Sequence, residues 1–319
     1  MEIYTTFPCY NFKHMKTEAK PYLFNSISEL HRELGLPAPL HPLVSLVDYS
    51  TIKTDTTDLK KGMIFNFYKV SYKKNFKGKI RYGQSYYDFD EGGLSFVSPN
   101  QLISAAEEEE AEYGGYTLLF HPDFIRQHPL GKNIKNYGFF SYSVAEALYL
   151  SEKEKNVITG IFRNIEMELD SSIDHFSQDV MISQIELLLN YSKRFYSRQF
   201  ITRKSGNNDL SLKLEELLSS YFDDEKTLVT GLPTVKQLSD ELHVTPHYLS
   251  DMLRTLTGQN TQQHIHNKLI EKAREMLSTT NLSIAEVAYR LGFEHPQSFN
   301  KLFKRKTSMS PVEFRQSFN

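Results

Sequence analysis

The chain has 319 residues, of which 39% are hydrophobic and 24% charged, and this length fits about two globular domains. Thirty-seven Lys and Arg against 39 Asp and Glu leave a net charge of -2, so any surface that binds nucleic acid must be local. The single cysteine, Cys9, excludes an internal disulfide framework and a zinc site built from cysteines alone.

Two further absences bear on location. The first residues lack the cationic region and apolar run of a signal peptide, and no stretch approaches the roughly 18 apolar residues of a membrane span. We therefore expect a cytoplasmic protein that makes no membrane contact. The sequence suggests no His partner for Cys9, so we interpret its thiol as inert.

Short apolar runs between residues 40 and 120 predict β-strands. They are Leu43–Val47, Met63–Tyr68, Leu94–Val97 and Tyr116–Phe120. Glycine pairs at 92–93 and 114–115 permit the positive-φ turns that residues with a Cβ resist. We expect a small antiparallel sheet or barrel within residues 1–150, with the acid-rich stretch 107–112 as a solvated hairpin tip.

The hydrophobic period changes after residue 150. Apolar residues recur at helical spacing in two successive stripes, 157–169 and 182–195, so residues 151–202 should form two amphipathic helices. These helices could pair with a second copy of the chain or pack on the sheet. Residues 203–209 contain no apolar side chain and combine Gly with small polar groups, which predicts a linker before a last domain at 210–319.

The last domain contains an internal repeat with a period of roughly 50 residues. Each copy reads as one helix that ends at Leu242 or Leu291, a tight turn and a second helix, which is helix-turn-helix geometry. The motif needs a small residue where its helices touch and a residue that tolerates positive φ in the turn. Proline is favourable in the first turn of its second helix. The residues that meet these demands are Ser239, Ala288, His243, Gly292, Pro246 and Pro296.

Between the two copies, residues 261–278 read as one helix with Ile265, Leu269 and Ala273 on its buried side. At ~1.5 Å per residue this strut spans roughly 27 Å. When the diameter of the flanking helices is added to this length, the strut can hold two recognition helices near the ~34 Å spacing of successive major grooves on one face of DNA. A single chain could thus occupy two adjacent grooves.

Burial of the apolar positions decides which side chains of the second helices face outward. Side chains able to hydrogen-bond to base edges are expected at His247, Ser250, Asp251, Gln297, Asn300 and Lys301. Cations placed for phosphates, which fix register without reading sequence, are expected at Arg254, Lys304, Arg305 and Lys306. The alternative is that these side chains form ordinary solvated helix faces.

Charge is divided unevenly between the copies. Residues 254–319 hold ten Lys and Arg against five Glu, whereas residues 207–253 hold three against nine acids. We expect the second copy to supply most of the affinity for DNA. The first copy should touch DNA weakly or selectively, because Asp251 would repel a phosphate.

With these residues the segment from about 210 to 319 resembles the DNA-binding domain of the AraC/XylS family of bacterial transcription regulators. The match includes Ile284–Ala288 and Gly292-Phe293, and it continues through Phe299, Phe303-Lys304 and the stretch from Ser310 to Arg315. Ser308 departs from the glycine often seen before that final stretch, and His243 departs at the first turn. Residues 90–200 resemble the family's cupin-type regulatory domain more loosely.

The resemblance implies an α+β multidomain protein. Its parts would be a cupin-like antiparallel β-barrel sensor at 1–150, a helical dimerisation segment at 151–202, a linker at 203–209 and an all-α domain at 210–319 with two helix-turn-helix motifs joined by a long helix. The implied function is sequence-specific regulation of transcription, and the sequence does not distinguish an activator from a repressor. The implied partners are double-stranded DNA, a small-molecule effector, RNA polymerase and a second copy of the chain as a homodimer.

We expect no enzyme activity, no metal and no cofactor. His264 and His266 lie two apart on one predicted helix and so point to opposing sides, and His121 fits a strand-to-helix corner better than a ligand. The sequence holds no nucleophile elbow and no phosphate-cradling glycine loop. Two alternatives stay open: a cupin-type small-molecule binder or enzyme with a helical interaction tail, and a regulator that has lost ligand dependence.

Overall fold

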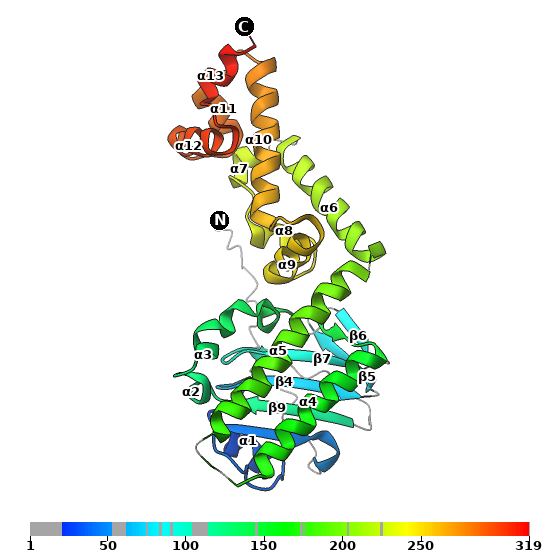
Figure 1. Ribbon diagram of the computed structural model, residues 1–319. Coiled ribbons are helices and arrows are strands. Elements are labelled where there is room, and N and C mark those ends of the chain that lie inside the picture. The colour runs from blue at the N-terminus through cyan, green and yellow to red at the C-terminus, as the bar shows by residue number, and fades with distance from the viewer. Residues whose placement is uncertain are drawn as a thin grey trace, which may run out of the picture.

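The computed structural model describes residues 21–52, 62–74, 76–82, 85–89, 92–103, 114–143, 146–172, 174, 176–202, 204–223 and 226–318. Cys9 and the acid-rich stretch 107–112 lie outside these residues. A β-sheet region with covering helices forms the N-terminal part, and a helical region forms the C-terminal part (Figure 1), which confirms the mixed α and β class. Within the described ranges, no helix has the length and apolar character needed to cross a membrane.

The N-terminal region is built on a five-stranded antiparallel sheet. In spatial order its strands are β10 (Leu148–Tyr149), β7 (Gly93–Val97), β4 (Tyr68–Lys74), β9 (Gly114–Phe120) and β2 (Val44–Asp48). A three-stranded sheet holds β1 (Tyr22–Phe24), β3 (Met63–Phe65) and β8 (Leu102–Ile103), and a separate hairpin pairs β5 (Phe76–Tyr82) with β6 (Ser85–Phe89). Pairing among the described strands gives separate open sheets, so barrel closure stays a prediction.

Alternation along the strands assigns each side chain to one face of the five-stranded sheet. On one face, Tyr72 of β4 and Leu118 of β9 join the main hydrophobic core. On the other face, Leu119 of β9 packs in a second core with Phe24 and Phe65 of the three-stranded sheet. All four predicted apolar runs form strands, but the run from residue 63 to 68 is divided between β3 and β4.

Short helices occupy the edges and ends of the sheets. They are α1 (Ile27–Glu33), η1 (Tyr49–Thr51), α2 (Pro122–Ile125), α3 (Pro129–Asn133), η3 (Ile134–Asn136) and η4 (Gly138–Ser141). His121 is the N-cap residue of α2, and its ring accepts a hydrogen bond from the Asp123 N–H at 3.2 Å. The strand-to-helix corner expected at this histidine is therefore confirmed.

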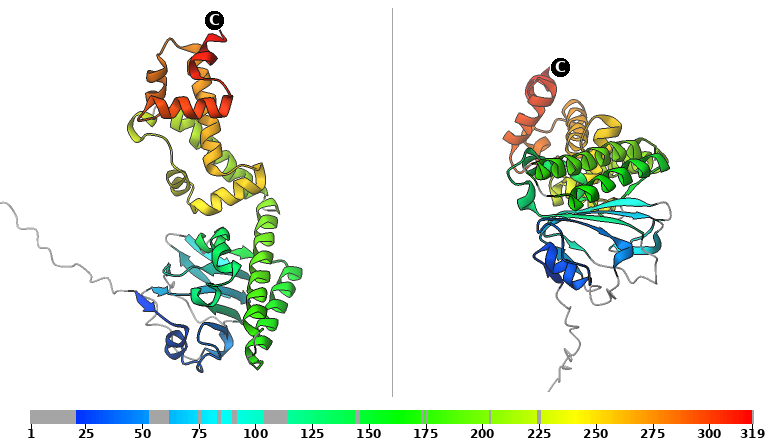
Figure 2. Two further views of the ribbon diagram at one scale, coloured as in Figure 1. Left: turned by 60° about the vertical axis from the view of Figure 1, so that its left-hand side comes forward. Right: turned by 60° about the horizontal axis from the view of Figure 1, so that its bottom comes forward.

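Two long helices cover one face of the five-stranded sheet (Figures 1 and 2). They are α4 (Glu152–Asp170) and α5 (Ser177–Thr202). Their apolar stripes, including Ile161 and Ile185, are buried in the same core as the sheet residues. The two predicted amphipathic helices are confirmed. Their apolar stripes were expected to pack either on a second copy of the chain or on the sheet, and in this structure they pack on the sheet of the same chain.

The predicted linker is helical where the structure describes it. Helix α6 (Lys204–Asp223) begins within the segment 203–209, whereas the polar composition predicts an irregular connection. The reason lies just downstream, because Leu214 and Leu218 of α6 are buried in the core that runs from the N-terminal sheet to α9 and α10. Packing of one apolar face stabilises a helix more than local propensity does, so α6 extends back over the polar residues.

The C-terminal region is helical throughout, as predicted. Its helices are α7 (Thr227–Thr230), α8 (Val235–Glu241), α9 (Pro246–Thr257), α10 (Thr261–Thr279), α11 (Ile284–Arg290), α12 (Pro296–Thr307) and α13 (Pro311–Gln316). The three predicted capping boxes form at Thr234, Ser283 and Ser310, where each side chain accepts from the N–H three residues later. Each box pairs two backbone N–H groups, those of the N-cap residue and of the residue three positions later, which the helix itself leaves without partners.

The ends of α9 and α12 provide a first prediction about stability. Helix α9 ends at Gly258 with φ of 76°, and α12 ends at Ser308 with φ of 64°. The left-handed conformation costs a residue with a Cβ roughly 1–2 kcal/mol. We therefore expect Ser308→Gly to raise the free energy of unfolding by up to about 1 kcal/mol after the entropic cost of glycine.

The matched control is Gly258→Ala, where nothing lies within 4 Å of the added Cβ. It should lower the free energy of unfolding by about 1–2 kcal/mol through backbone strain alone. Urea unfolding of the full chain, followed by helical circular dichroism, measures both changes. A destabilised Ser308→Gly chain would contradict this account of the helix end.

Candidate nucleic-acid interface

Two helix-turn-helix units are present at the predicted positions. In the first unit α8 is capped at Leu242 and leads through His243 to α9, and in the second α11 is capped at Leu291 and leads through Gly292 to α12. The turn residues have φ of 57° at His243 and 90° at Gly292. Positive φ was expected at both, and Asn, Asp and His are the side chains that tolerate it best.

Close helix contacts also fall where the sequence predicts them. Ser239 of α8 and Ala288 of α11 are completely buried. A side chain at position 292 is also excluded by packing, because an added Cβ would lie 2.8 Å from the backbone carbonyl carbon of Gly231. The second turn therefore needs glycine both for its φ and for its contact with the segment before α8.

The strut between the units is α10, which extends one residue beyond the predicted end. Its 19 residues span roughly 28 Å at ~1.5 Å per residue. Helices α9 and α12 lie toward opposite ends of α10 (Figure 2, left). This length, with the girth of the two helices, suits the ~34 Å spacing of successive major grooves.

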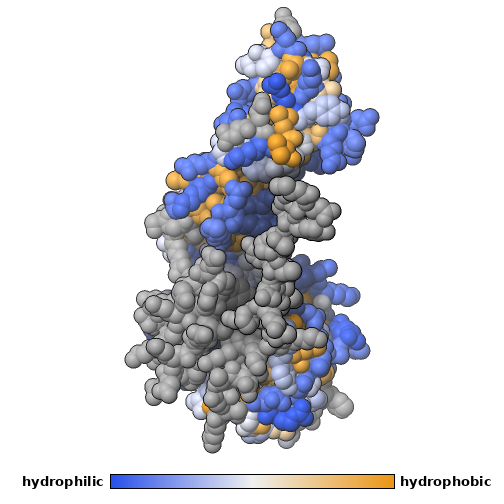
Figure 3. Space-filling model, turned by 180° about the vertical axis from the view of Figure 1, so that it is seen from behind, coloured by the Kyte–Doolittle hydropathy of each residue, from blue (hydrophilic) through white to orange (hydrophobic). Residues whose placement is uncertain are grey.

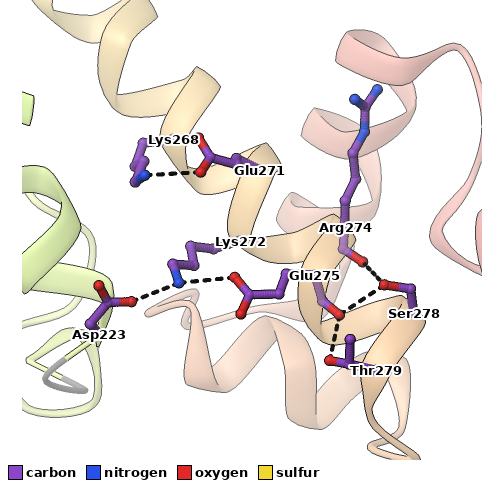
Figure 4. Close-up of polar contacts among 8 residues, drawn as sticks. All are labelled: Asp223, Lys268, Glu271, Lys272, Arg274, Glu275, Ser278 and Thr279. Atoms are coloured by element: carbon purple, nitrogen blue, oxygen red, sulfur yellow. Dashed lines mark hydrogen bonds and ion pairs between the residues drawn. The ribbon is translucent and has the colours of Figure 1, made fainter.

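Polar contacts tie the strut to the helix that leaves the N-terminal region. Lys272 of α10 donates to Asp223 at the end of α6, at 2.6 Å, and to Glu275 one turn further along, at 2.9 Å (Figure 4). At the far end the Arg315 Nε–H of α13 donates to the Leu277 carbonyl at 3.3 Å. These contacts hold α6, α10 and α13 together around the second unit.

The second recognition helix, α12, presents the face that the sequence predicts. Phe299, Leu302 and Phe303 are buried. The candidate base-reading residues Gln297, Asn300 and Lys301, and the phosphate candidates Lys304, Arg305 and Lys306, are exposed. Seen from behind, the surface of the helical region is mainly hydrophilic with separate hydrophobic patches (Figure 3).

Arg305 and Lys306 bring positive charge to the strut. Burial lowers the pKa of His266 on α10, and the two cations lower it further. His264 instead shares a hydrogen bond with Thr257 at the end of α9, at 2.9 Å. The two histidines thus have different neighbours, and among the described residues no cluster of three metal-ligating side chains occurs.

The first recognition helix, α9, differs from the prediction in two residues. The Ser250 hydroxyl shares a hydrogen bond with Thr261 Oγ1 of the strut at 3.0 Å, so this side chain is directed toward α10 rather than outward. Asp251 forms an ion pair with Arg254 at 3.1 Å and also accepts a hydrogen bond from Tyr142 of the N-terminal region at 2.8 Å. His247 and Arg254 are exposed, as predicted.

A buried carboxylate of the N-terminal region meets the first turn of α9. Glu146 is 6% exposed, and it accepts from the Thr245 N–H at 2.6 Å and from the Thr245 hydroxyl at 2.7 Å. Burial raises the pKa of Glu146, while hydrogen bonds from Thr245 and Ser143 act in the opposite direction. Thr245 is the N-cap residue of α9, so the acid lies at the positive end of this helix.

Sequence reasoning did not single out Tyr142, Glu146 or Thr245. The one available signal was Tyr248, a large aromatic side chain next to the inward-facing Leu249. Tyr248 is 8% exposed, and its ring lies 5.3 Å from Tyr142 and 5.2 Å from Phe200. An aromatic residue at this position indicates a partner outside the helix-turn-helix unit.

Two helix-turn-helix units on one strut, with a cationic second recognition helix, define a DNA-binding region. Comparison with known proteins agrees, since the family model described as a helix-turn-helix domain matches residues 238–317. The C-terminal region of the chain is an AraC-type helix-turn-helix domain.

The chain is similar to several bacterial regulators over this region. It is 34% identical over 83 residues to the uncharacterised regulator YisR of Bacillus subtilis, covering 26% of this chain and 29% of YisR. It is 32% identical over 141 residues to the transcriptional activator RhaS of an Enterobacter strain, covering 44% of this chain and 46% of RhaS. The chain thus covers less than half of each of these two relatives.

Solved structures resemble the same region. One is the C-terminal domain of the two-component response regulator yesN from Fusobacterium nucleatum, at 31% identity and a TM-score of 0.28. The likeness covers 32% of this chain and 96% of that chain.

The exposed face of α12 generates a prediction that separates phosphate contact from base reading. Lys304→Ala should weaken binding to all DNA sequences and make the slope of log affinity against log salt shallower by about 0.9, because one fewer counterion is released. Gln297→Ala should cost roughly 1–3 kcal/mol at one base pair and little on random DNA. Fluorescence anisotropy of the full chain at several salt concentrations measures both effects.

Lys153→Ala is the matched control, since Lys153 is exposed on α4 in the N-terminal region. Its salt slope should equal that of the unchanged chain. If Gln297→Ala weakened binding to the selected site and to random DNA equally, the base-reading role of Gln297 would be wrong.

Proposed function

We propose that the protein is a transcription regulator that binds two adjacent major grooves of double-stranded DNA through α9 and α12. The supporting observation is the pair of helix-turn-helix units at opposite ends of α10, with the exposed cations Lys304, Arg305 and Lys306 on the second unit. The base-reading residues are Gln297, Asn300 and Lys301 on α12, and His247 and Asp251 on α9. Ser250 has a smaller part, because its hydroxyl already bonds to the strut.

The proposed sensor is the N-terminal region, with its effector between the five-stranded and three-stranded sheets. The inner face of the larger sheet carries buried hydroxyls, and Thr117 Oγ1 lies 2.5 Å from Ser71 Oγ and 2.9 Å from Tyr49 Oη. Burial acts to raise the pKa of Tyr49, but Lys69 and Lys73, together with hydrogen bonds to Ser71 and Thr117, lower it overall. This polar, cationic surrounding suits an effector that carries hydrogen-bond acceptors.

The proposal includes cupin-like closure of the sensor, a domain boundary near residues 203–209 and a homodimer. Because the inward stripes of α4 and α5 are covered by the sheet, a dimer would use their outward faces. Exposed apolar residues are available there at Met167, Val180 and Leu187. RNA polymerase is a further proposed partner, and effector control distinguishes this regulator from one that responds only to its own abundance.

A second candidate, a small-molecule binder or enzyme with a helical interaction tail, makes a different prediction. Effector binding alone would raise the thermal stability of the chain by mass action without any effect of DNA sequence. The RhaS and YisR relatives are regulators by name, and this favours the DNA-binding proposal for the whole chain.

Mapping the occupancy of the full chain across its own genome tests the proposal. We expect discrete sites that share a motif with two half-sites roughly 10–10.5 base pairs apart, the spacing of successive major grooves. Gln297→Ala should redistribute the chain among sites, whereas Lys304→Ala should reduce occupancy everywhere. Uniform occupancy with no shared motif would rule out sequence-specific regulation.

A further inference from the structure

The contact between the N-terminal region and α9 uses residues that the proposed function assigns to DNA. Asp251 is a candidate base-reading residue, and its Oδ2 atom accepts the hydrogen bond of the Tyr142 hydroxyl at 2.8 Å. Burial and the nearby Asp251 carboxylate raise the pKa of Tyr142, so this hydroxyl keeps its proton. A carboxylate that is held in this way is not free to accept from cytosine N4 in a major groove.

The first turn of α9 is occupied in a similar way. N-terminal residues of a recognition helix approach the DNA, and the free N–H groups at a helix N-terminus are a natural place for a phosphate. Here the Glu146 carboxylate takes both the N–H and the hydroxyl of Thr245. An acid of the N-terminal region therefore stands where an acidic DNA backbone would approach.

The second unit shows what the same positions look like without this contact. Counting from Pro246 and Pro296, the residues Thr245, Tyr248 and Asp251 correspond to His295, Ser298 and Lys301. All three of these α12 residues are exposed. Among the described residues, these contacts with the N-terminal region thus involve the first unit, and they fall on three positions at which the two units differ in chemistry.

The hydrophobic cores divide along the same line. Leu249, Met252 and Leu253 of α9 belong to the core that runs through the N-terminal sheet and α5. Phe299 and Phe303 of α12 belong to a separate core made within the second unit. The first unit therefore shares a core with the proposed sensor, whereas the second unit has a separate core and is joined to the sensor through α6 and α10.

We infer that the contact of Tyr142 and Glu146 with α9 is an autoinhibitory contact, in which the N-terminal region and DNA compete for the same side of the first recognition helix. This inference rests on the proposed function and specifies its regulation. The second unit stays available for DNA at all times. The first unit reads its groove only after Asp251 and Thr245 are released.

Gly138 of η4 offers a way to open the contact from the N-terminal side. A Cβ at this position would overlap the Asp251 Oδ2 atom, and Asp251 is the closest group that it would meet. Because Gly138 has no positive φ, alanine fits its backbone. Gly138→Ala should displace the Asp251 carboxylate from the Tyr142 hydroxyl, and it changes no candidate DNA-binding residue.

Tyr142→Phe opens the contact by a different route. It keeps the ring that packs on Tyr196 and Tyr248 and removes only the hydroxyl that donates to Asp251. A hydrogen bond to a charged group shifts a two-state equilibrium by roughly tenfold or more, and apparent affinity follows the fraction of binding-competent chains. Each variant should therefore bind its DNA roughly tenfold more tightly than the unchanged chain.

Matched controls exist for both variants. Gly160→Ala places a methyl group on α4 where nothing lies within 4 Å. Tyr137→Phe removes a hydroxyl that donates to Asn190 of α5 at 3.0 Å, within the N-terminal region. Neither control should change DNA affinity.

The experiment uses the full chain and a genomic DNA fragment that the unchanged chain enriches from a fragment pool. Anisotropy measures affinity for this fragment, and hydrogen–deuterium exchange follows the segments 138–146 and 245–250. We expect tighter binding and faster exchange at 245–250 in Gly138→Ala and Tyr142→Phe. We also expect DNA to speed exchange at 138–146 in the unchanged chain, because DNA displaces that segment from α9.

The outcomes distinguish a failure of the autoinhibitory contact from a failure of the proposed DNA-binding function. If Lys304→Ala weakens binding but Gly138→Ala and Tyr142→Phe match their controls, the autoinhibitory contact is wrong and the DNA-binding proposal stands. The autoinhibitory contact would also be wrong if DNA left the hydrogen–deuterium exchange rate of residues 138–146 unchanged. If the unchanged chain and all variants show no salt-dependent DNA binding, the proposed function fails and the inference fails with it.

Discussion

The arrangement of the whole molecule depends on one packing constraint: the first helix-turn-helix unit shares its hydrophobic core with the N-terminal region. Leu249 and Met252 of α9 are completely buried in a cluster that continues through α6 and α5 to the sheet. Removing such side chains from their neighbours costs several kcal/mol each. The position of α9 is therefore set by the N-terminal region as much as by its own short partner helix α8.

The sequence predicts the local features of the DNA-binding region well because each depends on neighbouring residues. Capping boxes, the turn at Gly292 and the buried stripe of α10 are all encoded within a few positions. The contact between Tyr142 and Asp251 joins residues 109 positions apart, and no periodicity reports such a pairing. For the same reason the sequence pattern places Ser250 on the outer face, whereas its hydrogen bond to Thr261 depends on how α9 packs against α10.

The helical conformation at residues 204–209 has the same origin. Polar composition describes what a segment prefers in isolation, whereas the apolar face of α6, with Leu214 and Leu218, packs into the core shared by the N-terminal sheet, α9 and α10. A helix that is held by tertiary contacts can include residues of poor propensity. The described part of the polar stretch, residues 204–209, thus forms the first turns of α6.

The uneven charge of the two units follows from this coupling. A cationic α12 with its own core can attract DNA through phosphates and needs no release, so it suits the part of the interface that supplies affinity. Once α12 is bound, α10 presents α9 to the next groove at a high effective concentration. DNA and the N-terminal region then compete for α9 within one complex, and the balance between two such intramolecular contacts is shifted by modest free energies. An acid at Asp251, which would weaken general attraction to DNA, is favourable in this setting because it gives the N-terminal region a group to hold.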